Sequence, residues 1–170
     1  MAELAGVTTG AIYGNFKNKE DLFLAAAAVG AALIVPVVKP GMTLEAVMHA
    51  MAQAVIAAIP RRRSAILGTL RFHAYALTHE ELRARILAST AKAYRAMAAG
   101  LRATTSESAL PMPPETLIAI THAMTDGLLL HRFLTPELIP DTVIHAAFAA
   151  LCGNVHKGVR SLSDFLQQEK

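Results

Sequence analysis

Alanine content is the feature that most constrains the fold of this chain, because 33 of its 170 residues are Ala. Ala has the strongest intrinsic preference for the α-helix, and Leu and Met follow it closely. Hydrophobic residues make up 54% of the sequence and charged residues 17%. A chain this apolar can bury enough surface to offset the conformational entropy that folding removes. The composition therefore predicts an all-α fold and excludes an intrinsically disordered chain.

The single cysteine, Cys152, excludes a disulfide within the chain. A lone thiol suits a reducing compartment, and we expect a cytoplasmic protein. We expect no secretory signal, because Met1 leads directly into Glu3 and a polar stretch. The net charge of +3 is too small an excess to indicate nucleic-acid binding by itself.

The longest uncharged run covers residues 22–38 and invites a membrane interpretation. A membrane-spanning helix needs about 20 predominantly apolar residues. This run is shorter, contains Pro36 and is rich in Ala, and Glu20 and Asp21 adjoin its start. A buried helix of a helical bundle is the favoured interpretation, so we expect no membrane partner; a small membrane-associated protein is the weaker alternative.

Proline, glycine and capping residues divide the chain into successive helices. Asn18 can cap a helix over 19–35, which Pro36 stops. Thr43 can cap a second helix that ends at Pro60. The spacing of apolar residues predicts four more helices. These cover 61–78, the segment from a cap at Thr78 through Leu101, 114–133 and 141–157.

Two of these helices carry a stripe of residues along one face, and we expect the stripe of the first to face inward. In the helix over 61–78 the stripe consists of Ile66, Leu70, His73 and Leu77. In the next helix it consists of Leu82, Ile86, Thr90, Tyr94, Met97 and Leu101.

The first two dozen residues carry the most specific pattern. They predict the end of one helix, a tight turn at Gly6, a short helix over 8–16, a second turn and then a long helix. This is the second half of a helix-turn-helix, in which a short recognition helix enters the major groove. Thr8 and Thr9 lie at the N-terminus of that short helix, where hydroxyl and amide groups can meet phosphates or base edges.

This segment closely resembles the DNA-binding signature of the TetR family of transcriptional repressors. The matching positions are the turn Ala5-Gly6-Val7, the core Gly10-Ala11-Ile12-Tyr13, Phe16, Lys19 and Leu22. The resemblance implies that the chain contacts operator DNA through Thr8, Thr9, Gly10, Ala11, Tyr13, Asn15 and Lys19. The alternatives are a helix cap at Thr8 and a half-buried packing role for Tyr13.

The family's domain begins earlier than this chain does, with a basic first helix and the front of the second. The resemblance therefore implies a partial DNA-binding region with its connecting helix at 1–35, and we expect this chain to bind DNA weakly. Residues 36–170 would form a helical effector-binding and dimerisation domain. The alternative function is a small-molecule-binding helical dimer that has lost DNA binding by truncation.

The same resemblance implies a homodimer formed through the helices over 114–133 and 141–157. The sequence offers an apolar face on each of them, which can instead belong to the core of a single chain. The first face consists of Leu117, Ile120, Met124 and Leu128, and the second of Ile144, Phe148, Leu151 and Val155. Two-fold operators require paired half-sites about 34–36 Å apart, which favours the dimer.

A small, apolar effector is the expected ligand of the helical region. Met side chains adapt to irregular volumes, and a few polar groups can fix the orientation of a ligand. Each Met can equally fill the core, and His73 can be a satisfied core histidine. The candidate lining residues are Met51, Phe72, His73, Tyr94, Met97 and His122.

Catalysis and metal binding have little support in the sequence. It contains no phosphate loop and no nucleophile elbow, and Cys152 has no activating neighbour. His122 and Asp126 share a helical face, but a metal site needs a further ligand. We therefore expect no enzyme activity, no cofactor and no metal. The favoured function is a ligand-responsive repressor, in which the helix over 19–35 transmits the effector signal.

Overall fold

The computed structural model describes residues 36–63 and 66–153, together with Asn18, Asp21, Leu22, Ala25 and Ile34. All regular structure within this part of the chain is helical, which confirms the predicted all-α fold. The elements in order are α3 (Leu44–Arg62), α4 (Ile66–Ala76), α5 (Glu80–Thr104), the 3₁₀ turn η2 (Glu107–Ala109), α6 (Pro114–Leu134) and α7 (Asp141–Ala150).

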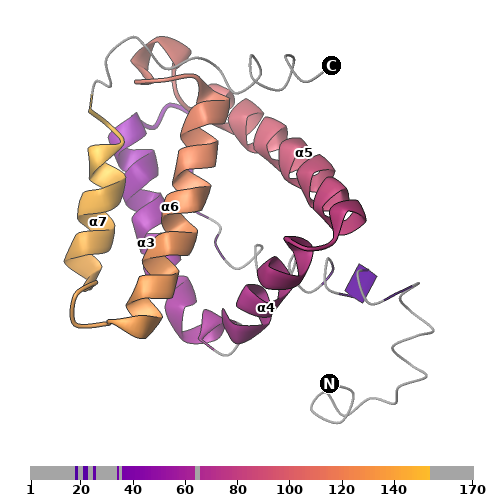
Figure 1. Ribbon diagram of the computed structural model, residues 1–170. Coiled ribbons are helices and arrows are strands. Elements are labelled where there is room, and N and C mark those ends of the chain that lie inside the picture. Colours follow the sequence, from indigo (N-terminus) through magenta and orange to yellow (C-terminus); the bar gives the residue numbers. More distant parts are fainter. Residues whose placement is uncertain are drawn as a thin grey trace.

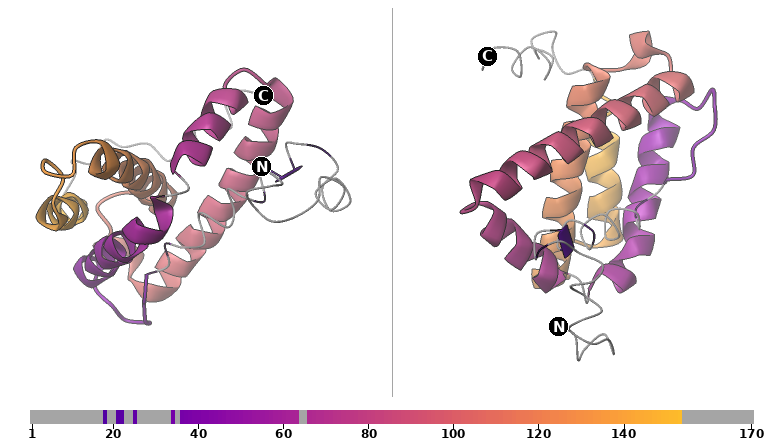
Figure 2. Two further views of the ribbon diagram at one scale, coloured as in Figure 1. Left: turned by 90° about the horizontal axis from the view of Figure 1, so that it is seen from below. Right: turned by 90° about the vertical axis from the view of Figure 1, so that its right-hand side faces the viewer.

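Helices α3, α6 and α7 form a bundle, to which α5 and α4 add an oblique arm (Figure 1). The most extensive packing is that of α3 against α7 and of α5 against α6. Figure 2 shows from two further directions that α5 crosses α6 at an angle and that α4 lies at the far end of α5. None of the described helices is long and apolar enough to cross a membrane.

Two helix caps predicted from the sequence are confirmed. The Thr43 hydroxyl accepts a hydrogen bond from the amide of Ala46 at 3.2 Å and starts α3. The side-chain oxygen of Asn18 accepts one from the amide of Asp21 at 2.9 Å. Asp21, Leu22 and Ala25 are helical, whereas the full extent of the predicted helix over 19–35 lies outside the described residues.

The boundary expected at Pro60 is wrong, because α3 continues through Pro60 to Arg62. A proline removes one backbone donor, and in the last turn few further bonds depend on it. The amide of Arg63 still donates to the carbonyl of Ile59 at 3.2 Å. The helix expected over 61–78 is accordingly shorter, since α4 ends at Ala76. Thr78 does not cap α5: its hydroxyl donates to the carbonyl of Tyr75.

The buried apolar residues form two clusters. The larger one fills the bundle and includes Val55, Leu117, Ile144 and Phe148, none of which is exposed. The smaller one lies where α4 meets α5 and consists of Phe72, Ala76 and Leu82, with Tyr75 and Ile86 against it.

The inner stripe predicted for α4 is wrong. Leu77 is 79% exposed and Leu70 is 40% exposed, while Phe72 and Ala76 are buried. The apolar residues of this short helix are distributed over all of its faces, so their spacing does not predict which face is buried. The stripe on α5 is confirmed at Leu82 and Leu101 but not at Met97, which is exposed; the buried residue there is its neighbour Ala98.

The loop before α3 is attached to the end of α5 by two hydrogen bonds. The amide of Gly41 donates to the carbonyl of Thr104 at 2.9 Å, and the Thr105 hydroxyl donates to the carbonyl of Met42 at 2.9 Å. Gly41 has a φ of 83°, a left-handed conformation that glycine adopts without strain. These bonds hold the beginning of the bundle against the upper end of the oblique arm.

Helix α6 starts at Pro114, as predicted, and ends one residue beyond the predicted 133. Helix α7 ends at Ala150 rather than at 157. The amides of Leu151, Cys152 and Gly153 all donate to carbonyls three residues back, so the chain tightens into a turn there. The guanidinium of Arg132 joins the two helices by donating to the carboxylate of Asp141 at 2.8 Å.

Candidate functional site

The expected DNA-contacting residues lie outside the part of the chain that the structure describes. These are Thr8, Thr9, Gly10, Ala11, Tyr13, Asn15 and Lys19. The structure does describe Asp21, which lies in the first turn of the helix that follows them. The carboxylate of Asp21 accepts a hydrogen bond from the guanidinium of Arg85 on α5. This ion pair joins segments that are 64 residues apart in the sequence.

The six candidate effector-binding residues lie in three places. Met51 packs against the bundle core, and Phe72 belongs to the separate cluster between α4 and α5. His73 is exposed beside Phe72 on α4. Tyr94 and Met97 lie on α5, and His122 lies on α6. The structure brings Tyr94 and His122 into contact and does not gather the other four around them.

The contact between Tyr94 and His122 crosses from α5 to α6. The Tyr94 hydroxyl lies 2.8 Å from Nδ1 of His122, and the two rings meet edge to face with centroids 5.7 Å apart. On its other side, Nε2 of His122 lies 3.6 Å from a carboxylate oxygen of Asp126. The three side chains thus form a chain of polar groups that ends in a carboxylate.

Burial raises the pKa of the Tyr94 phenol, and the nearby negative charge of Asp126 raises it further. The phenol therefore remains protonated at neutral pH, and its proton can be donated to Nδ1 of His122. His122 and Asp126 are about half exposed. One phenol, one imidazole and one carboxylate thus lie together at the contact of α5 and α6.

Threonine side chains on the buried side of α6 were not singled out by the sequence analysis. The hydroxyls of Thr116 and Thr121 are buried and have no hydrogen-bond partner. The Thr125 hydroxyl, by contrast, donates to the carbonyl of Thr121 at 2.7 Å. In the sequence, a threonine at helical spacing is indistinguishable from an uncharged surface residue. The burial of these hydroxyls therefore becomes visible only in the packed structure.

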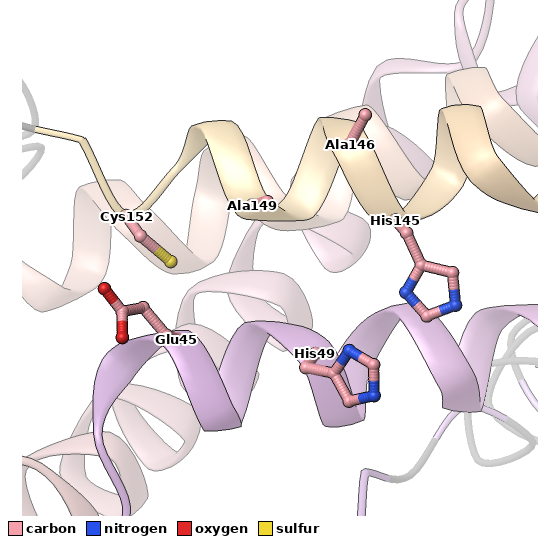
Figure 3. A pocket seen from close by; sticks show the side chains of 6 residues that line it. All are labelled: Glu45, His49, His145, Ala146, Ala149 and Cys152. Atoms are coloured by element: carbon pink, nitrogen blue, oxygen red, sulfur yellow. The ribbon is translucent and has the colours of Figure 1, made fainter.

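A groove between α3 and α7 is lined by Glu45, His49, His145, Ala146, Ala149 and Cys152 (Figure 3). The rings of His49 and His145 are stacked, with centroids 5.0 Å apart and planes inclined by 26°. Burial raises the pKa of the Cys152 thiol, and the charge of Glu45 raises it further. The thiol is therefore protonated at neutral pH and a poor nucleophile.

The sequence analysis missed this groove, because its two walls are about a hundred residues apart in the chain. The only local signal was the spacing of Glu45 and His49, which places them on one face of a helix. Within the described ranges, no three His, Cys, Asp or Glu side chains converge closely enough to hold a metal ion.

Comparison with known proteins matches the beginning of the chain to a protein family. No curated protein and no solved structure matches the chain. Residues 1–26 match the family described as bacterial regulatory proteins of the TetR family. The matched segment contains all seven residues that the sequence analysis assigns to DNA contact, and its end includes Asp21. These first 26 residues are therefore similar to the DNA-binding region of the TetR family of bacterial regulatory proteins.

Proposed function

We propose that this TetR-family regulator is a repressor that binds operator DNA through the recognition helix over 8–16. A small, mostly apolar effector releases it from the DNA. The observation that carries the proposal is the ion pair between Asp21 and Arg85. It links the end of the family-matched segment to α5, the helix that also carries Tyr94.

The chemistry around Tyr94 supports an effector with one hydrogen-bonding group on an apolar body. Tyr94 and His122 provide a donor and an imidazole within 2.8 Å of each other. Met97 lies one turn further along α5 and is 47% exposed, so its flexible thioether is available to an apolar ligand. Few polar groups and an adaptable apolar surface are typical of small-molecule sites.

Helix α5 provides a direct route between the two sites. Arg85 and Tyr94 are nine residues apart on it, which corresponds to about 13 Å along the helix axis. An effector that binds better to one position of α5 shifts the population toward that position. Because Arg85 holds Asp21, the shift alters the placement of the segment that reads DNA.

We also propose that the regulator is a homodimer formed through α6 and α7. Leu117, Ile144 and Phe148, which were expected at the interface, lie in the chain's own core, so that part of the expectation is corrected. Val155 lies outside the described residues. Other apolar residues of the two helices remain exposed, among them Ile120, Leu134 and Val143. These residues are available to a second copy of the chain.

The dimer is tested by sedimentation of Ile120→Glu beside Val37→Glu. Val37 lies before α3 and is 78% exposed, so it is a control for adding a charge at an exposed apolar position. We expect Ile120→Glu to sediment as a monomer while Val37→Glu and the unchanged chain sediment as dimers. Identical behaviour of the two variants would remove α6 from the interface.

The DNA-binding proposal is tested by selection from a pool of random DNA duplexes, followed by titration of the enriched sequence. Lys19→Gln should weaken binding and reduce the slope of log affinity against log salt by about 1, because one phosphate contact is lost. Lys39→Gln is the matched control, since Lys39 is an exposed lysine outside the family-matched segment. If no duplex is enriched, the small-molecule-binding dimer without DNA recognition replaces the repressor.

A further inference from the structure

We propose that His49 on α3 and His145 on α7 together bind one divalent transition-metal ion of the class that prefers imidazole, such as Zn²⁺ or Ni²⁺. The site is the groove between the two helices, and it is separate from the contact between Tyr94 and His122. The separation of the two rings, the packing of the helices that carry them and the charge of the groove support this assignment.

The separation of the two rings fits a shared ion. Two imidazole nitrogens bound to one zinc ion at about 2.0–2.1 Å lie about 3.3 Å apart in tetrahedral geometry. Ring centroids 5.0 Å apart allow this spacing, because each nitrogen lies at the edge of its ring. Because the rings are stacked, the two side chains must rotate about their torsions to aim one nitrogen each at a common point.

The two histidines come from the helices that pack most extensively against each other, α3 and α7. Their positions are therefore fixed by the core of the bundle, in which Val47 and Val55 of α3 pack with Ile144 and Phe148 of α7. A metal site gains from such rigidity, because little conformational entropy is lost when the ligands are already in place. The ion would bridge two helices whose separation is already set.

The charge of the groove suits a cation. Glu45 is the one charged residue among those that line it, and it carries a negative charge. Figure 3 shows Glu45 and Cys152 at one end of the groove and the two imidazoles at the other. No lysine or arginine lines the groove to repel a metal ion.

The coordination would be completed by water. No third side chain among the described residues converges with the two imidazoles, so this is an open site and not a closed structural one. Cys152 lies at the other end of the groove, beside Glu45 and away from the two imidazoles (Figure 3). Imidazole pairs favour Zn²⁺, Ni²⁺ and Cu²⁺ over Mg²⁺ and Ca²⁺, which prefer oxygen ligands.

Calorimetric titration of the full chain with Ni²⁺ tests the proposal. The protein is prepared without a histidine tag, and thermal unfolding is followed with and without the ion. His49→Gln and His145→Gln each remove one ligand and keep a polar side chain. His73→Gln is the matched control, because His73 is an exposed histidine on α4, away from the groove. Cys152→Ser tests whether the metal ion binds to the thiol and not to the two imidazoles.

We expect the unchanged chain, His73→Gln and Cys152→Ser to bind one Ni²⁺ and to unfold at a higher temperature in its presence. Both groove variants should bind it more than about tenfold more weakly, since loss of even an outer-shell partner costs about 10–100-fold. Equal binding by all four variants would overturn the proposal. Loss of binding in Cys152→Ser alone would overturn it as well. Unfolding without metal verifies that each variant is folded.

Discussion

The Tyr94 hydroxyl on α5 lies 2.8 Å from Nδ1 of His122 on α6, and this contact joins two helices that diverge along their length. The contact belongs to the packing of α5 against α6, which is among the most extensive in the described part of the fold. A hydrogen bond at such a point both stabilises the packing of α5 on α6 and presents polar groups to a ligand.

Replacing Tyr94 by Phe should lower the free energy of unfolding by about 0.5–1.5 kcal/mol, the usual net contribution of one hydrogen bond. His122→Gln should cost a similar amount. If the two groups act through each other, the double variant should lose less than the sum of the two single losses. Urea denaturation of the four proteins measures this coupling. Losses that add within about 0.3 kcal/mol would contradict a direct interaction.

The stability of the fold should decline at alkaline pH because of Tyr94. Its pKa is raised above the ordinary value of 10.0 in the folded state, so folding favours the neutral phenol. The stabilisation is fully present below pH 10.0 and is lost as the pH rises through the higher folded pKa. Unfolding measured between about pH 9 and pH 11 should show a steeper decline for the unchanged chain than for Tyr94→Phe. Parallel curves would exclude this role.

At acidic pH the corresponding group is Glu115 at the start of α6. Its pKa is lowered first by the hydrogen bond from Arg102, which lies at 3.0 Å, and so the folded state favours the carboxylate. That stabilisation is present above the ordinary pKa of 4.5 and is lost as the pH falls through the lower folded value. Glu115→Gln should therefore flatten the loss of stability below pH 4.5. Glu137→Gln, which removes a carboxylate at an exposed position, is the control variant.

The threonines of α6 give a prediction in which one substitution has opposite signs at two positions. Thr121→Val removes a buried hydroxyl that has no partner, so it should raise stability by about 1 kcal/mol through relief of the desolvation cost. Thr125→Val removes a hydroxyl that donates to the Thr121 carbonyl at 2.7 Å, so it should lower stability. Chemical denaturation of both variants measures the difference. A loss at Thr121 as large as that at Thr125 would indicate that the Thr121 hydroxyl is satisfied, for example by bound water.

Local signals in the sequence predicted the order of the helices and the start of several of them. A cap acts within three residues of itself, and so Asn18 and Thr43 could be recognised without knowledge of the fold. Pro114 likewise marks the start of α6, because a proline fits the first turn of a helix, where its missing donor is not needed. The TetR signature was also a local pattern, and the family match at 1–26 confirms it.

Interactions between distant segments were not predicted. The apolar residues of α4 lie on all sides of the helix. The contact of α4 with α5 therefore decides that Phe72 is buried and Leu77 is exposed. On α7, Ile144 and Phe148 are buried in the chain's own core. The pattern of apolar residues on a single helix cannot distinguish such a core face from a dimer interface. The sequence analysis placed Tyr94 and His122 in the same candidate site but could not predict that they are in contact. Their distance depends on how α5 crosses α6, which the sequence pattern does not give.

The ion pair of Asp21 and Arg85 allows a test of whether α5 influences the segment that reads DNA. Their side chains are 21% and 40% exposed, so their mutual attraction is screened less than that of a surface pair. Arg85→Gln should change the affinity for a selected DNA duplex by up to about fivefold, equivalent to about 1 kcal/mol. Arg83→Gln is the matched control, because Arg83 pairs with Glu80 on the same helix and both side chains are largely exposed. Asp21→Asn should reproduce the effect of Arg85→Gln and add nothing to it in the double variant. Equal effects of Arg83→Gln and Arg85→Gln on DNA affinity would mean that the charge of α5 acts through its general field, and not through the contact with Asp21.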